Sequence, residues 1–166
     1  MNQGGRTSEA APYPMMRLGP VTLPAPPVAP RQIEAAHGHL WQWVGDGEPL
    51  LSLTVAVRET QMGDSTGVLY RLNTEIDLVR GLLDDPDGAS VERNDLVFVQ
   101  GSTAAPAGAA VDGMRDGMPV RIGIVVASDG VSMHVIQVSV AEGKEGRALA
   151  AHILDQIEIT PWRDPG

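Results

Sequence analysis

The chain has 166 residues, carries a formal net charge of -9 at pH 7 and contains no cysteine. This length suits one domain, and a composition of 43% apolar and 20% charged residues is typical of a folded globular protein. The absence of cysteine excludes disulfides, thiolate nucleophiles and cysteine–zinc sites within the chain, and the acidic balance disfavours binding to a nucleic-acid backbone.

The N-terminal segment differs in composition from the rest of the chain. More than half of the 13 prolines lie in residues 1 to 32, where each removes a backbone donor and disfavours helix at the residue before it. We therefore expect residues 1 to 15 to form a flexible arm. Apolar residues favour a short edge strand over 17 to 23, and residues 24 to 32 should then cross as an extended loop.

Two strands and a long helix are expected next. Residues 37 to 44 and 50 to 58 have strand patterns and are joined by a turn rich in glycine and aspartate. Residues 66 to 83 favour a helix with one apolar stripe, because apolar residues recur there at alternating spacings of three and four. The stripe consists of Leu69, Leu72, Ile76, Val79 and Leu83.

The second half of the chain has mainly strand patterns. Residues 91 to 100 favour a strand, and the Ala/Gly-rich stretch from 101 to 111 is ambiguous between loop and strand. Residues 119 to 127 and 131 to 140 flank Asp129-Gly130, which predicts a type I′ hairpin turn because that turn needs positive φ at both positions.

A second Asp-Gly turn is expected just before this hairpin. Asp116-Gly117 and Asp112-Gly113 compete for it. The pattern closes with a helix over 142 to 157. Since strands and helices do not alternate one for one, the chain is expected to be an α+β domain spanning residues 16 to 160. We expect an antiparallel sheet of about six strands flanked by two main helices, followed by a tail over 161 to 166.

This order of elements resembles the PsbP-like fold. The resemblance lies in an early strand that ends in Leu23-Pro24, a Trp-bearing strand, a mid-chain amphipathic helix, and a closing strand and helix from Val135 to Ile159. A weak terminal pattern, Gly146-Arg147-Ala148-Leu149-Ala150 leading to Ile153, belongs to it. The group includes photosystem II PsbP, Ran-GTPase-binding domains of the Mog type, LpqN-type lipoproteins and chaperones for secreted effectors. The resemblance implies a non-catalytic adaptor or binding domain.

The chain departs from the LpqN type because it has neither a cysteine nor an N-terminal apolar segment typical of a signal peptide. We therefore expect a cytoplasmic location, provided that Met1 is the natural start. No apolar run approaches the ~18 residues that a membrane helix needs, so we expect no membrane insertion.

One predicted strand concentrates unusual side chains on one face. By period-2 alternation, four side chains share that face: His37, His39, Trp41 and Trp43. Tryptophan is common in binding hot spots, which makes the four candidate binding residues for a partner or an apolar ligand. The alternative is that both tryptophans lie in the core under a helix. His37 and His39 also suit zinc or nickel, although no nearby residue supplies a third ligand.

Two segments that could form catalytic motifs lack required residues. Gly101-Ser102-Thr103-Ala104 does not match a nucleophile elbow, and Gly143-Lys144 is followed by Glu145 rather than by the Ser or Thr of a P-loop. His134 is expected to be a partly buried, hydrogen-bonded histidine. We expect no catalytic residues, no cofactor and no metal.

The sequence therefore favours a non-enzymatic protein-binding module, an adaptor or a chaperone for secretion or assembly. The partner is expected to be a protein rather than a nucleic acid, and the sequence does not indicate the oligomeric state. A second hypothesis is a carrier of a small apolar ligand, held in a cavity of a few hundred Å³ between sheet and helix. A third is a small enzyme or metal-binding protein that uses His37 and His39.

Overall fold

The computed structural model describes residues 13–26, 30–35, 38–43, 53–61, 67–94, 97–103, 105–130, 132–141 and 143–159. These residues form two antiparallel sheets, two α-helices and a short 3-10 helix, η1 (Pro86–Gly88). No helix in the described ranges combines the length and apolar composition needed to cross a bilayer.

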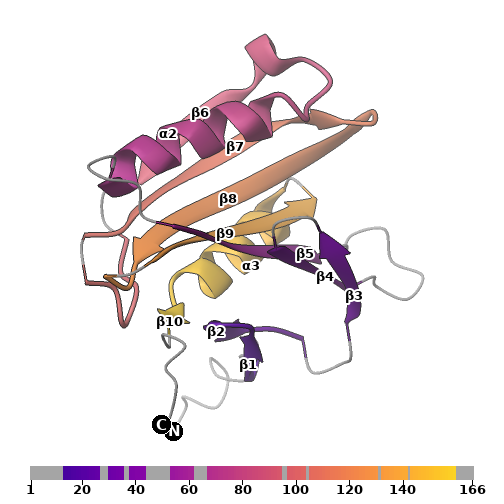
Figure 1. Cartoon of the computed structure of the whole chain (residues 1–166). Helices are drawn as coiled ribbons and strands as arrows, with labels where there is room; N and C mark the ends of the chain where they lie inside the picture. Colours follow the sequence, from indigo (N-terminus) through magenta and orange to yellow (C-terminus); the bar gives the residue numbers. More distant parts are fainter. Residues whose placement is uncertain are drawn as a thin grey trace, which may run out of the picture.

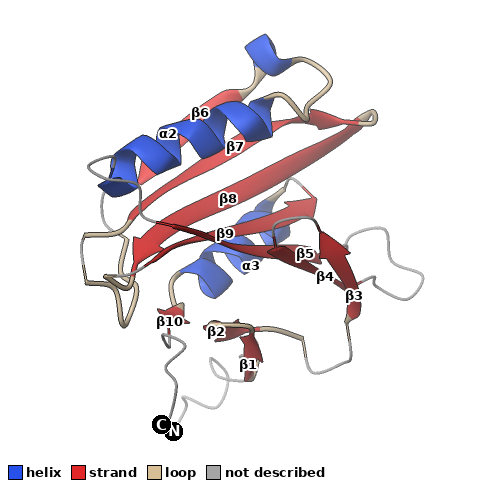
Figure 2. Ribbon diagram, in the orientation of Figure 1, coloured by secondary structure: helices blue, strands red, loops and turns tan. Residues whose placement is uncertain are grey.

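The larger sheet has seven strands in the order β3-β4-β5-β9-β8-β7-β6 (Figures 1 and 2). Their bounds are Arg31–Ala35 for β3, Gly38–Trp43 for β4, Leu53–Gln61 for β5, Ser132–Ala141 for β9, Met118–Ser128 for β8, Ala107–Arg115 for β7 and Ser90–Asn94 for β6. All neighbours in this sheet pair antiparallel. The α+β class and the antiparallel sheet are confirmed, and the prediction of about six strands was slightly low.

A smaller sheet contains β1 (Met15–Leu18), β2 (Val21–Pro24) and β10 (Glu158–Ile159) in the order β1-β2-β10. The strand predicted over 17 to 23 is therefore a hairpin that turns at Gly19. Residues 24 to 32 do not form a loop throughout, because β3 begins at Arg31, directly after Pro30.

Two helices cover opposite faces of the larger sheet: α2 (Gly67–Arg80) and α3 (Lys144–Leu154). Alternation along β8 shows this arrangement. Ile122, Ile124 and Val126 pack with α2, whereas Val125 and Ala127 belong to the core on the α3 face. A central strand that is apolar on both sides needs cover on both sides, and the two helices provide it.

The helix α2 confirms most of the predicted stripe, but Leu69 is 66% exposed rather than buried. The buried face of the helix consists of Leu72, Glu75, Ile76 and Val79. Glu75 lies on this face because Arg58 of β5 donates a hydrogen bond to it. The buried face is therefore centred closer to Glu75 than the apolar residues alone predict, which leaves Leu69 at its margin.

The predicted hairpin turns differ in outcome. Asp116 and Gly117 both have positive φ, 53° and 79°, so the β7–β8 turn has the predicted type I′ character and Asp112-Gly113 lies inside β7. Both N–H groups of this turn donate to the carboxylate of Asp84, and these hydrogen bonds lower the pKa of Asp84. At Asp129-Gly130 only the glycine has positive φ, so the type I′ prediction is wrong there.

Two further segment predictions are corrected. The strand expected over 91 to 100 ends at Asn94, and residues 97 to 99 have no regular structure. The ambiguous stretch from 101 to 111 contains the start of β7 at Ala107. Small residues are compatible with this strand because it lies between β6 and β8, where backbone pairing on both sides holds it.

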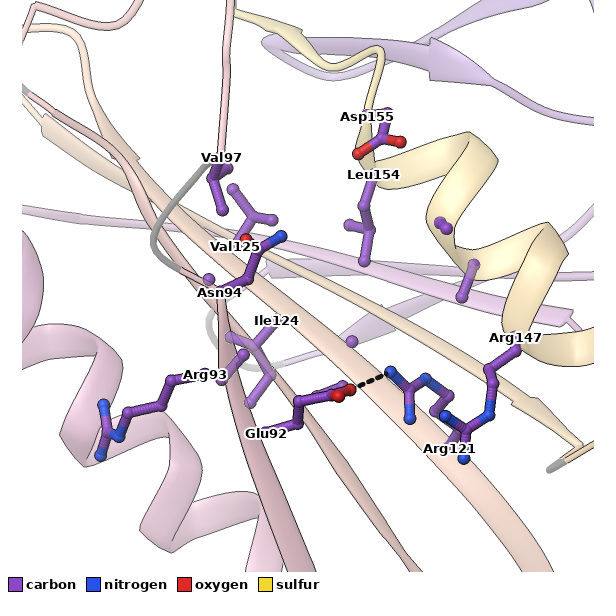
Figure 3. Close-up of a pocket in the computed structure, with 16 residues that line it drawn as sticks. Glu92, Arg93, Asn94, Val97, Arg121, Ile124, Val125, Arg147, Leu154 and Asp155 are labelled. Carbon is purple, nitrogen blue, oxygen red and sulfur yellow. Dashed lines mark hydrogen bonds and ion pairs between the residues drawn. The ribbon is translucent and has the colours of Figure 1, made fainter.

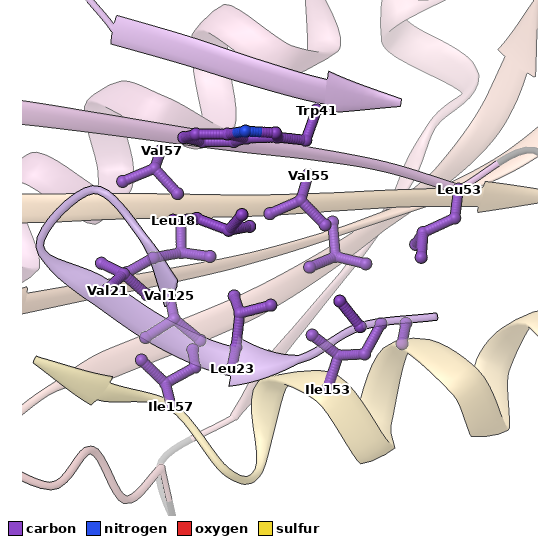
Figure 4. Close-up of a cluster of buried hydrophobic side chains, with 14 of the residues drawn as sticks. Leu18, Val21, Leu23, Trp41, Leu53, Val55, Val57, Val125, Ile153 and Ile157 are labelled. Carbon is purple, nitrogen blue, oxygen red and sulfur yellow. The ribbon is translucent and has the colours of Figure 1, made fainter. Parts of the chain in front are cut away.

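The core on the α3 face joins both sheets (Figure 4). Leu18, Val21 and Leu23 of the small sheet pack with Trp41 of β4 and Ile153 of α3. Burying one tryptophan removes about 200 Å² from water, which corresponds to roughly 5 kcal/mol before the entropy of ordering is subtracted. The small sheet thus closes this face over β4 and β5, beside α3.

Gly146 permits the close approach of α3 to the end of β9. A Cβ at this position would overlap the carbonyl oxygen of Ala141. We expect Gly146→Ala to lower the free energy of unfolding by about 1–3 kcal/mol, although alanine is the better helix former. Urea denaturation measures this change.

Gly81→Ala is the matched control, because a Cβ at Gly81 would make only ordinary contacts, the nearest at 3.4 Å from the carbonyl oxygen of Leu78. It should be neutral or stabilise by about 0.4–1 kcal/mol. Equal stability of Gly146→Ala and the wild type would contradict the packing of α3 described here.

Candidate functional site: the α3 cleft

A cleft of about 310 Å³ lies between α3 and the β6–β8 part of the larger sheet (Figure 3). We call it the α3 cleft. Its helix wall consists of Arg147, Ala150, Ala151 and Leu154, followed by Asp155. The sheet supplies the floor, and Val97 lies on the side opposite the helix. This is the volume range of small-molecule sites in proteins.

Small residues form the floor of the cleft. In the register of the sheet, Ala110 pairs with Gly123 and Gly108 pairs with Val125, so side chains of three adjacent positions are absent or reduced to one methyl. A Cβ at Gly123 would overlap the side chain of Leu154. Because α3 packs mainly on β9 and β8, the floor over β7 has no helix above it.

One end of the cleft is charged. Arg121 of β8 donates hydrogen bonds to Asp112 at 2.7 Å and to Glu92 at 2.9 Å. Arg147 of α3 lies 3.8 Å from the same Asp112 carboxylate. Figure 3 shows the two guanidinium groups next to each other at this end, with Glu92 facing Arg121 across the floor.

Glu92 and Arg121 hold each other in their ionised forms. The hydrogen bond and the charge of Arg121 lower the pKa of Glu92. Burial acts to lower the pKa of Arg121, but the hydrogen bonds and charges of Glu92 and Asp112 outweigh it and raise that pKa. Arg121 is therefore a fixed cation, with a side chain only 12% exposed.

Polarity falls along the cleft in the same direction on both walls. On the sheet, Arg121 is followed two and four residues later by Gly123 and Val125, which face the same side. On the helix, Arg147 is followed two turns later by Leu154. Both walls therefore change from guanidinium to aliphatic side chains, with Asp155 at the far rim. The site suits a molecule that is polar at one end and apolar along its length.

The cleft offers several charged groups for binding. Among its described lining residues, the ionisable side chains are three arginines, Glu92 and Asp155. The third, Arg93, donates to Asn73 of α2, and Figure 3 shows its side chain pointing toward that helix, away from Arg121.

The residues predicted to bind lie elsewhere. Trp41 and Trp43 are both buried in the core on the α3 face, with 7% and 4% of their surface exposed, as the core alternative expected. His39 is exposed at the edge of this core, with its ring centroid 5.6 Å from that of Trp41. His37 lies outside the described residues. None of these described residues lines the α3 cleft.

A second polar cluster lies near the β8–β9 turn. One possible ligand atom from each of Glu59, Asp129 and His134 lies within 4.8 Å of the others. Both oxygens of Asp129 are already engaged, however: Oδ1 accepts the N–H of Ser132, and Oδ2 lies 2.8 Å from Nε2 of His134. The arrangement is that of a capped turn that positions a buried histidine. His134 is hydrogen-bonded as predicted, and buried more deeply than predicted.

A third polar cluster lies under α2. Glu75 is fully buried and accepts hydrogen bonds from Arg58 of β5 and Gln137 of β9, and Arg71 lies one helical turn away at 3.6 Å. These contacts tie α2 to the β5–β9 pair. A buried carboxylate needs such partners because it has no water to solvate it.

One motif was missed in the sequence. Gly63-Asp64-Ser65-Thr66-Gly67 matches the G-x-S-x-G pattern and joins β5 to α2. A nucleophile elbow belongs to an α/β-hydrolase sheet, whereas β5 pairs antiparallel with both of its neighbours. Residues 63 to 66 lie outside the described residues, and the fold around the motif is not the one that such an elbow needs.

The cleft residues were also missed, although the sequence carried a signal for them. Gly108, Ala110 and Gly123 are the small residues on the floor of the cleft, and the side chains of Val97 and Leu154 approach the two glycines closely. In a strand, small residues at alternate positions leave one face without large side chains, while the residues between them keep the other face apolar. Reading that signal requires the strand assignment of 107 to 115, which the sequence left ambiguous.

Comparisons with known proteins support the fold. No protein-family model and no curated protein matches the chain. Among solved structures, it is similar to LpqN, a protein of Mycobacterium tuberculosis involved in cell envelope biogenesis, with a TM-score of 0.54 and 15% identity over 85% of this chain and 83% of that one.

It is also similar to PA94, a putative regulator of unknown function from Pseudomonas aeruginosa, with a TM-score of 0.48 and 12% identity over 83% of this chain and 89% of that one. The likeness to LpqN supports a shared fold. Membership of a wider PsbP-like group stays a prediction.

The Glu75 cluster gives an asymmetric prediction. Arg58→Leu leaves a fully buried carboxylate without its closest partner, whereas Glu75→Leu leaves an arginine whose side chain is 29% exposed and reaches water. We expect Arg58→Leu to destabilise by roughly 3 kcal/mol and Glu75→Leu by clearly less. Urea denaturation of both variants at neutral pH compares them. Equal losses of unfolding free energy in the two variants would contradict the role of Arg58 as the partner that stabilises the buried Glu75 carboxylate.

Proposed function

We propose that this protein is a non-catalytic binding module and that the α3 cleft holds the apolar part of its ligand. The observation that carries the proposal is the cleft of about 310 Å³ over Gly108, Ala110 and Gly123, which Ala151 and Leu154 of α3 line from the side of the helix. Filling an apolar recess removes apolar surface from water, which is the main driving force for such binding. This proposal is the hypothesis of a carrier for a small apolar ligand, with the α3 cleft as the ligand cavity.

The comparison with LpqN is compatible with a binding role, since that protein is involved in cell envelope biogenesis. A cytoplasmic location for this chain stays a prediction, and cell fractionation with an antibody against the chain would test it.

The test uses two exposed alanines of the same helix. Ala151 lines the cleft and Ala148 does not, while both are exposed, so neither substitution disturbs the core. The probe is N-phenyl-1-naphthylamine, an uncharged dye whose fluorescence rises in apolar surroundings. We expect Ala151→Phe to weaken dye binding about tenfold or more, because the ring fills the space that the dye occupies.

Ala148→Phe should bind the dye as the wild type does. Equal dye affinity of Ala151→Phe and the wild type, or no dye binding by the wild-type protein, would contradict the cleft as an apolar binding site. Circular dichroism of both variants checks that α3 is intact.

A protein partner is the second candidate, and exposed apolar side chains favour it. Leu69, Tyr70 and Leu78 on α2 are each more than half exposed, on the face of the sheet opposite the α3 cleft. A partner that docks on α2 should be lost with Leu78→Glu and kept with Ala151→Phe. A ligand of the cleft should show the reverse, so this pair of variants separates the two functions.

A further inference from the structure

The charged end of the α3 cleft already contains a carboxylate bound to an arginine. Glu92 accepts a hydrogen bond from Arg121 at 2.9 Å, and it does so from β6, the edge strand of the larger sheet. Its side chain is 67% exposed. The geometry therefore shows where a negative oxygen binds in this cleft, and the group now bound there belongs to the chain itself.

The contact between Glu92 and Arg121 is weak, so a ligand can displace Glu92 from it. An ion pair with one largely exposed partner adds little stability, because water solvates the exposed group nearly as well as its partner does. Asp112 is different, because its carboxylate is 20% exposed and binds Arg121 at 2.7 Å. Asp112 fixes the arginine in place, and Glu92 occupies its outward side.

A second cation lies on the other wall of the same end. Arg147 projects from α3, and its side chain is 49% exposed. Arg121 and Arg147 thus approach one point from the sheet and from the helix (Figure 3). Two guanidinium groups that converge from different elements suit a planar anion such as a carboxylate, which each can bind through two parallel hydrogen bonds.

From these contacts we propose that the ligand of the α3 cleft is an amphiphile with an anionic head, which Arg121 and Arg147 bind in place of the Glu92 carboxylate. The head lies at the charged end, and the apolar tail runs along the cleft toward Val125 and Leu154. Glu92 is then a built-in competitor that tunes affinity. The proposal rests on the proposed function, since it specifies the chemistry of a ligand for the same cleft.

The experiment compares two probes that differ only in the head group. Dodecanoate carries a carboxylate and 1-dodecanol carries a neutral hydroxyl, and isothermal titration calorimetry below the micelle concentration measures both. The wild-type protein should bind dodecanoate at least fivefold more tightly than dodecanol, because only the carboxylate pairs with the arginines.

Three substitutions on exposed residues separate the roles. Arg147→Gln should weaken dodecanoate about fivefold, and Glu92→Gln should strengthen it severalfold by removing the competing charge. Arg115→Gln is the matched control, because this arginine of β7 is also exposed but does not line the α3 cleft. It should leave both affinities unchanged, and none of the three should change dodecanol binding.

The outcomes distinguish this inference from the proposed function. If dodecanol and dodecanoate bind equally, or if Arg147→Gln and Glu92→Gln leave dodecanoate affinity unchanged, the anionic head is wrong. Should Ala151→Phe still abolish binding of both probes in that case, the cleft itself stands. Binding of both probes that is insensitive to Ala151→Phe would remove the proposed function as well. A wild-type protein that binds dodecanol but not dodecanoate would overturn the inference alone.

Discussion

The fold depends on a pair of central strands, β8 and β9, that are apolar on both faces. Ile122 and Ile124 face one side of β8, and Val125 and Ala127 face the other. Such strands are stable only where both faces are shielded from water. The two helices therefore lie on opposite faces of the sheet, and the small β1-β2-β10 sheet adds cover on the α3 face. The other features of the fold depend on how much of the larger sheet the two helices and the small sheet cover.

Neither helix is wide enough to cover the whole sheet. On the face of α2, the helix packs over β7 and β8, and the space toward β5 and β9 is filled by Glu75 with Arg58 and Gln137. On the face of α3, the helix packs over β9 and β8, and the space toward β7 and β6 is left as the cleft. On the α2 face, a buried polar cluster thus fills the part of the sheet that the helix does not cover. On the α3 face, the corresponding space stays open as the cleft.

The open gap is the feature that the proposed binding function requires. A cleft with small residues on its floor and aliphatic residues at one end favours an apolar ligand, and the arginines at its other end favour an anionic group. The buried polar clusters elsewhere have a different character. Glu75 and Asp129 are each held by several partners, so they stabilise contacts between elements.

The sequence by itself determined those features that depend on local periodicity and turn chemistry. These include the antiparallel α+β class, the buried side chains of α2 from Leu72 to Val79, and the Asp116-Gly117 turn, because each is encoded by spacing or by a φ preference within a few residues. Long-range pairing decided the rest. Glu75 became buried, and Leu69 exposed, through an arginine of β5, and Trp41 became core because the distant β1-β2 hairpin packs over it.

The charged end of the cleft could not be predicted from the sequence, for the same reason. Arg121, Arg147 and Glu92 come from three elements and meet only through the register of β6, β7 and β8 and the position of α3. Local patterns determine which face of an element is apolar. Only the packed structure determines which part of that face stays uncovered, because that depends on the width of a helix relative to the sheet beneath it.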